Sequence, residues 1–226
     1  MSQQLPEKLR TKVAQDLRPV KPVAAPSVRL LLIVLWTCAA LVAVPALVGL
    51  RFNAPDLGFW LLWGATGAEA VAGLALVFLA LREGIPALGA PRGTLVSALL
   101  GAWVLQLGVA LFTHARCPCP ASGAMDHMAC FASETLLGIP ALLLTLFLVV
   151  RAYPLSPPRA GLLGGVGSGV MADAVQHLIC PVSDLRHVLL WHFGAVAALG
   201  LLGLVFGFVW EGMRLRRFRR DLEEGP

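Results

Sequence analysis

Charged residues are scarce in this chain, and their scarcity excludes most water-soluble folds. They make up 14% of the 226 residues, whereas hydrophobic residues make up 58%. Soluble domains carry roughly 25% charged residues. A water-soluble globule is therefore not expected, and this composition is typical of a protein embedded in a membrane.

Recognisable catalytic motifs are also lacking. We find no phosphate-binding glycine loop and no nucleophile–histidine–acid arrangement, and none of the five cysteines forms a Cys-x-x-Cys pair. The beginning of the chain does not resemble a cleaved signal peptide, because a polar segment of about 28 residues precedes the first apolar run. We predict that the protein is not an enzyme and that its first apolar segment stays in the membrane.

Six continuous apolar runs are present, each close to the ~20 residues that a helix needs to cross a bilayer. Because hydrophobicity does not alternate along them, barrel strands are not expected. We predict an all-α integral membrane protein with a bundle of six transmembrane helices. The predicted helices cover residues 30–50, 58–81, 93–113, 131–150, 160–180 and 188–210. The predicted domains are an N-terminal tail (1–28), a transmembrane domain (29–210) and a basic C-terminal tail (211–226).

Lysine and arginine lie almost entirely on one side of this predicted bundle. Of the 18 residues, 15 fall in the two tails or in the loops after the second and fourth helices; the other three are Arg51, Arg116 and Arg186. Such loops stay in the cytoplasm. We therefore predict cytoplasmic N- and C-termini and contact with anionic lipid rather than with nucleic acid. The segment Arg214–Arg220 is typical of a stop-transfer cluster, with regulation as the alternative.

The N-terminal tail contains an amphipathic pattern. Apolar residues recur every fourth position, at Leu5, Leu9, Val13 and Leu17, which on a helix would form one stripe. This stripe could bind a groove on a partner protein. A helix resting on the membrane surface and a weakly ordered tail are the alternatives.

The fifth predicted helix has small and ionisable residues at four-residue intervals: Gly161, Gly165, Gly169, Asp173 and His177. Glycines allow close helix packing, within one bundle or between two copies in a homo-oligomer. Ionisable groups at membrane depth usually face the bundle interior. Asp173 and His177, with His192 at the same level, could bond neighbouring helices, tune the Cys180 thiol or relay a proton.

The loop before the fourth predicted helix is rich in soft metal donors. It contains Cys117, Cys119, His114 and His127 together with Met125 and Met128. These donors suit Zn²⁺ or Cu⁺, but Cys117-Pro-Cys119 lacks the two-residue gap of a zinc knuckle. We expect a place where a soft metal ion or an oxidant reacts transiently, rather than a permanent structural metal site.

Two further cysteines lie at ends of the fourth and fifth predicted helices. Cys130 begins one and Cys180 ends the other, both at the predicted outer surface. In an oxidising compartment they can form a disulfide if their helices are neighbours. The bond could be a static clamp, or it could be made and broken by a signal.

Several short motifs, in this order, resemble one bacterial family. They are Asp16-Leu-Arg-Pro-Val-Lys-Pro22, Pro140, Arg151-Ala-Tyr-Pro154, His177-Leu-Ile-Cys180 and Leu190-Trp-His-Phe-Gly194. Together they resemble the NrsF-like ("negative regulator of sigma F") family of six-span membrane anti-sigma factors. Cys117-Pro-Cys119 with its Met/His-rich loop, and the longer basic C-terminal tail, depart from the family pattern.

The resemblance implies a function in transcription control. Such a protein holds an extracytoplasmic-function sigma factor at the inner face of the bacterial cytoplasmic membrane and releases it under envelope stress. The family's outer cysteine pair falls on Cys130 and Cys180, and its sigma-binding tail falls on Leu5–Leu17. A membrane thiol oxidoreductase and a metal permease are the alternatives, although the scattered intramembrane polar residues do not predict a permeation path.

Overall fold

The computed structural model describes residues 23–85, 88–119 and 124–224. Within these ranges the chain forms helices and no strands, which confirms the predicted all-α fold. The predicted partner-binding residues Leu5, Leu9, Val13 and Leu17 lie outside the described residues.

The helices agree in order with the six predicted segments. Two segments are composite: a π-helical stretch, η1 or η2, joins a short helix to a long one in each. The first three segments are α2 (Pro26–Val48); α3 (Ala54–Phe59), η1 (Trp60–Gly64) and α4 (Ala65–Glu83); and α5 (Arg92–Arg116). The last three are α6 (Ala124–Val150); α7 (Pro157–Ile179); and α8 (Leu185–His187), η2 (Val188–His192) and α9 (Phe193–Glu224).

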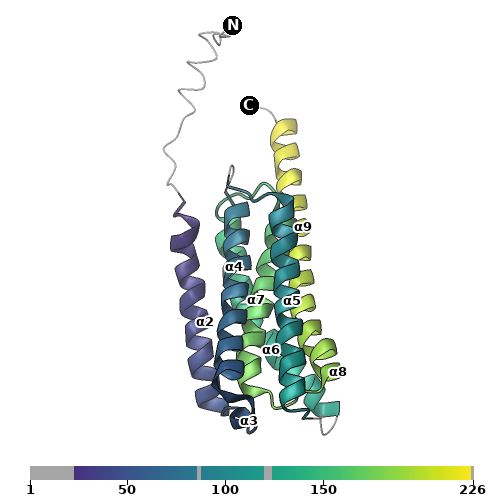
Figure 1. Cartoon of the computed structure of the whole chain (residues 1–226). Coiled ribbons are helices and arrows are strands. Elements are labelled where there is room, and N and C mark those ends of the chain that lie inside the picture. Colours follow the sequence, from purple (N-terminus) through teal and green to yellow (C-terminus); the bar gives the residue numbers. More distant parts are fainter. Residues whose placement is uncertain (1–22, 86–87, 120–123, 225–226) are drawn as a thin grey trace.

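Five of these segments are long and apolar enough to cross a membrane. The exception, α7, is a 23-residue helix that the other helices surround (Figure 1). From Ala160 to Leu178 its residues are buried, except for the partly buried Leu162. A helix shielded from lipid in this way does not need an apolar surface, which explains its many glycines and its ionisable residues.

The glycines of α7 bring its backbone against two other helices, as their spacing predicted. A Cβ atom at Gly161 would collide with the backbone of Gly203 in α9, and one at Gly165 would collide with Leu199. Elsewhere on α7, a Cβ atom at Gly167 would collide with the backbone of Gly73 in α4. The glycine rows therefore pack within one bundle, and the core of the protein lies along α7.

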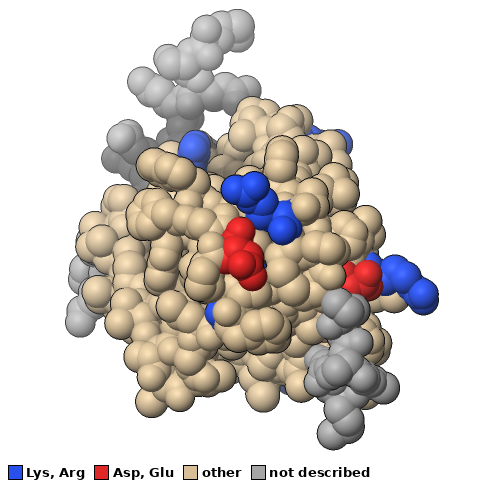
Figure 2. All heavy atoms as spheres, turned by 60° about the horizontal axis from the view of Figure 1, so that its bottom comes forward, with Lys and Arg blue, Asp and Glu red and all other residues tan. Residues whose placement is uncertain are grey.

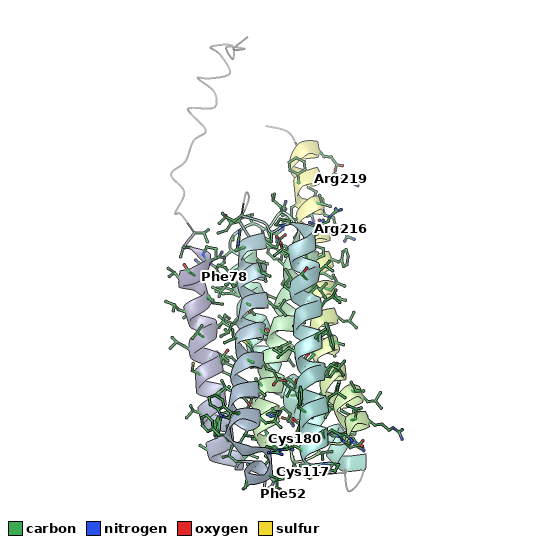
Figure 3. All side chains as sticks on the ribbon, in the orientation of Figure 1. Phe52, Phe78, Cys117, Cys180, Arg216 and Arg219 are labelled. Carbon is green, nitrogen blue, oxygen red and sulfur yellow. A yellow bond between two sulfur atoms is a disulfide. The ribbon has the colours of Figure 1, made fainter. Side chains whose placement is uncertain are left out.

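The two ends of the bundle differ in chemistry. At one end, here called the basic end, α2 begins and α9 finishes; Figure 3 labels Arg216 and Arg219 there. At the opposite end, here called the cysteine end, lie Cys117 and Cys180. Figure 2 brings the cysteine end forward and shows a mostly uncharged surface with a few scattered charged side chains. At the basic end α9 continues as a helix to Glu224.

One buried arginine ties three helices together at the basic end. The Arg29 guanidinium, in the first turn of α2, donates hydrogen bonds to the Leu81 carbonyl of α4 (3.0 Å) and the Leu148 carbonyl of α6 (2.8 Å). These carbonyls belong to helix ends, where no N–H of the same helix is available. Arg29 therefore attaches the start of the first helix to the ends of two others.

Candidate functional site

Cys130 and Cys180 meet at the cysteine end. Their sulfur atoms are 3.2 Å apart, so two cysteines 50 positions apart in the sequence are side by side as thiols. Cys130 lies near the start of α6 and is partly exposed, whereas Cys180 follows α7 and is buried. The pKa of Cys180 is raised above its ordinary value by its hydrogen bond with Cys130 and by burial. Cys180 is therefore the less accessible thiol.

Two histidines complete a group of possible metal ligands with these thiols. The donor atoms of Cys130, Cys180, His187 and His192 all lie within 4.8 Å of one another. Two thiolates and two imidazoles form a donor set that suits Zn²⁺ or Cu⁺. The cluster can thus undergo either of two reactions: oxidation to a disulfide or coordination of a soft metal ion.

Buried carboxylates lie next to this cluster, deeper in the bundle. His192 Nδ1 is 2.9 Å from an Asp173 oxygen and 3.2 Å from a Glu134 oxygen. The other Asp173 oxygen accepts a hydrogen bond from Gln106 of α5 at 2.6 Å. His192 therefore connects the thiol cluster to a polar network that joins α5, α6 and α7 to the segment leading into α9.

Asp173 and His177, which share one face of α7, have different hydrogen-bond partners. Asp173 bonds Gln106 and His192, whereas His177 Nε2 is 3.3 Å from the Leu61 carbonyl in η1. A water-sized cavity of about 30 Å³, lined by residues that include Asp173, His177, Cys180 and Glu69, lies between these groups. Asp173 and His177 thus bond neighbouring helices, which is one of the predicted roles.

Arg51 clamps the loop after α2 onto the end of α7. This buried guanidinium donates to Ser183 Oγ (2.6 Å), Asn53 Oδ1 (2.6 Å), and more weakly to the carbonyls of His177 (3.3 Å) and Pro181 (3.2 Å). Burial lowers the pKa of Arg51 from its ordinary value. The carbonyls at the end of α7 thereby receive a donor close to Cys180.

The other cysteine pair lies in the adjacent loop. Cys117 and Cys119 form a disulfide, with their Cα atoms 5.6 Å apart. The Asn53 amide nitrogen is 3.3 Å and 3.2 Å from the two sulfurs, and Ser183 N–H donates to the Cys119 carbonyl at 2.9 Å. This loop is therefore attached to the segment that carries Cys180, but its cysteines are not in the thiol–histidine group.

The two histidines suggested as metal ligands have different positions. His114 Nδ1 is 2.9 Å from the Ser183 carbonyl and is outside the four-ligand group. His127 Nδ1 is 2.6 Å from His187 Nδ1, so it contacts that group from its rim. His192, expected only as a supporting residue, belongs to the group itself.

Sequence reasoning missed several residues of the site. His187, Glu134, Gln106, Arg51 and Asn53 were not singled out as site residues, because each is isolated in the sequence and only the fold brings them together. One signal was available: Glu134 and Gln106 lie inside predicted membrane helices, where polar side chains are costly.

Comparison with protein families assigns the chain to a family. The family described as "negative regulator of sigma F" (NrsF) matches residues 13–210. The chain belongs to the NrsF family. The comparisons with curated proteins and with solved structures gave no match.

Membership in the NrsF family indicates the general function of the chain. By the family's description, the chain is a negative regulator of a sigma factor, and a sigma factor is its partner. The matched region includes Cys130, Cys180, His187 and His192 together with every helix up to residue 210. The site described above therefore lies within the matched region.

Proposed function

We propose that this chain is a membrane-bound anti-sigma factor that senses an envelope signal through Cys130 and Cys180. It crosses the bacterial cytoplasmic membrane six times, with the basic end in the cytoplasm. Residues of the N-terminal tail hold an extracytoplasmic-function sigma factor there. The observation that carries the proposal is the 3.2 Å approach of the two thiols at the end opposite the basic one.

The proposed signal acts on the thiol pair. An oxidant such as a peroxide would take two electrons and two protons from the pair as one S–S bond forms. A soft metal ion would instead displace the thiol protons and bind both sulfurs together with His187 and His192. Because a disulfide is about 2.05 Å long, oxidation has to bring the two sulfurs closer together, and in this proposal the start of α6 shifts relative to the end of α7 as they approach.

Helix α6 offers a route from this reaction to the basic end. Cys130 lies near its start, and Leu148, whose carbonyl binds Arg29, lies near its end. Pro140, inside α6, has no backbone N–H to donate, so the helix can bend there. We propose that a shift of α6 weakens the hydrogen bonds of Arg29, which follows the sigma-binding tail directly, and so releases the sigma factor.

The sequestration step is tested by deleting the tail. The full-length protein, purified from its native membranes, should retain an extracytoplasmic-function sigma factor, whereas a variant lacking residues 1–22 should not. Transcription from that sigma factor's promoters should rise in the deletion strain without any stimulus. Retention of the sigma factor by the deletion variant would refute this part of the proposal.

The sensing step is tested with serine substitutions. Cys130→Ser and Cys180→Ser should each abolish or strongly reduce induction by oxidant or soft metal while the protein still inserts into the membrane. Cys38→Ser is the matched control, because Cys38 lies on the outward face of α2, away from the pair. A wild-type dose response in both site variants would remove the thiols from the mechanism.

The route through α6 has a separate test. Arg29→Gln shortens the side chain and removes the guanidinium that holds the Leu81 and Leu148 carbonyls, so sigma-dependent transcription should rise without stimulus. Arg214→Gln is the control, because this residue binds a loop carbonyl, that of Pro154, at the same end (2.7 Å). Equal transcription in the two variants would exclude a role for Arg29 in release.

A further inference from the structure

A groove between α5 and α7 opens at the basic end. It has a volume of about 230 Å³. Five aliphatic side chains form its wall: Leu95, Val96, Leu99, Leu162 and Leu163. Its remaining lining residues are two exposed arginines, Arg92 at the first position of α5 and Arg159 in the first turn of α7. The groove is therefore apolar along its length and positively charged at its mouth.

The helix geometry adds to this charge. Helices α5 and α7 both begin at the basic end and run to the cysteine end, so their N-termini lie at the same level (Figure 1). Neither first turn contains an acidic residue, and neither N-cap side chain makes a capping hydrogen bond among the described residues. Helix N-termini carry partial positive charge. The first turn of α5 also has unpaired N–H groups, whereas α7 begins with Pro157 and Pro158, which have none. Both dipoles thus favour an anion at the place where the two arginines lie.

No carboxylate lines the groove among the described residues. Glu83, at the end of α4, is already bonded to the backbone N–H of Ala90 at 2.7 Å and is buried. The arginines at the mouth of the groove therefore have no acidic side chain in its lining to neutralise them. An occupant that complements the groove has to combine an anionic head with an apolar chain.

We propose that the α5–α7 groove is a binding site for an anionic phospholipid. One acyl chain lies along Leu95, Leu99 and Leu163, and the phosphate is held by Arg92 and Arg159. Basic residues at helix ends on the cytoplasmic side, next to an apolar cleft, are a recognised arrangement for anionic lipid headgroups. The site does not depend on the thiol chemistry, because it lies at the opposite end of the bundle.

The proposal is tested by lipid binding to the full-length, delipidated protein in detergent. Native mass spectrometry would follow the uptake of phosphatidylglycerol and, separately, of phosphatidylcholine. We expect phosphatidylglycerol to bind roughly tenfold more tightly. The variant R92Q/R159Q should lose this preference. The control R151Q/R217Q, which removes two exposed arginines from the same end but outside the groove, should keep it.

A second variant tests the apolar part of the groove. Leu99→Trp keeps both arginines but fills the cleft, and phosphatidylglycerol binding should weaken roughly tenfold. Unchanged binding in Leu99→Trp would show that phosphate meets the arginines without a chain in the groove, and would overturn the proposal. Equal affinity of the wild type for the two lipids would also overturn it, as would a preference that persists in R92Q/R159Q.

Discussion

At the scale of single residues, two arginines organise opposite ends of the molecule. Arg29 binds the ends of α4 and α6, and Arg51 binds the end of α7 and the segment after it. Both side chains are buried, with exposed fractions of 6% and 4%. In the sequence analysis the two arginines served only to predict which side of the membrane each loop faces. The structure shows that they also hold helix ends in place.

Loss of Arg51 should loosen the loop that carries Cys180. Arg51→Gln removes charge-assisted hydrogen bonds, each worth about 1.5–3 kcal/mol, and leaves carbonyls at the end of α7 without this donor. We expect a lower thermal midpoint in detergent and faster alkylation of Cys180 by maleimide. Arg116→Gln is the control, because Arg116 is an exposed arginine at the same end. Equal midpoints and equal alkylation rates for both variants would contradict this role.

At the scale of helices, sequence predicted the elements better than their roles. Hydrophobic length was enough to find α2, α4, α5, α6 and α9, because lipid contact imposes it. The glycine spacing of α7 correctly indicated close packing. The position of α7 at the centre was not predicted, because hydropathy alone does not distinguish a lipid-facing helix from one enclosed by others.

The close approach of α7 and α9 leads to a matched pair of glycine substitutions. In Gly165→Ala the new Cβ would meet the Leu199 backbone, and overpacking of this kind costs about 1–3 kcal/mol. In Gly101→Ala, on α5, the new Cβ has nothing within 4 Å. We expect only Gly165→Ala to lower the thermal midpoint of the purified protein. A similar midpoint for both variants would show that α7 and α9 are not closely packed.

The candidate site was predicted only in part, because the sequence does not show which side chains the fold brings together. Cys130 and Cys180 could be identified because each lies at the end of an apolar run on the same predicted side of the membrane. The two histidines next to them could not be paired with them, since His187 ends the short helix α8 and the position of His192 depends on the π-helical stretch η2. The partner-binding stripe from Leu5 to Leu17 stays a prediction, because it lies outside the described residues.

At the scale of the whole molecule, the proposed mechanism depends on which end of the bundle faces which compartment. The thiols are at the cysteine end, whereas Arg216 and Arg219 are at the opposite end, so the proposed signal travels the length of the bundle. The number of crossings decides whether the two termini face the same compartment. Five helices meet the length and composition expected of a membrane span, and α7 determines whether the total is six.

Alkaline phosphatase fusions can count these crossings, because the enzyme is active only in the periplasm. Fusions after Ser122 and after Ser183 should be active, whereas fusions after Gly89, Ser156 and Pro226 should be inactive. This pattern follows if α7 crosses the membrane and the basic end is cytoplasmic. Inactive fusions after both Ser156 and Ser183 would mean that α7 does not cross. Active fusions after Gly89 and Ser156, together with inactive fusions after Ser122 and Ser183, would reverse the proposed orientation.

During synthesis α7 leaves the ribosome before α9, the helix with which it shares its closest glycine contacts. A segment with so many glycines and a buried aspartate gains little by dissolving in lipid alone. In the proposed six-span topology, the insertion machinery therefore has to retain α7, or hold it against α4 and α6, until the last helix arrives. Truncation of the chain before residue 193 should accordingly leave α7 exposed to quality-control proteases, even though every residue of that helix has been made.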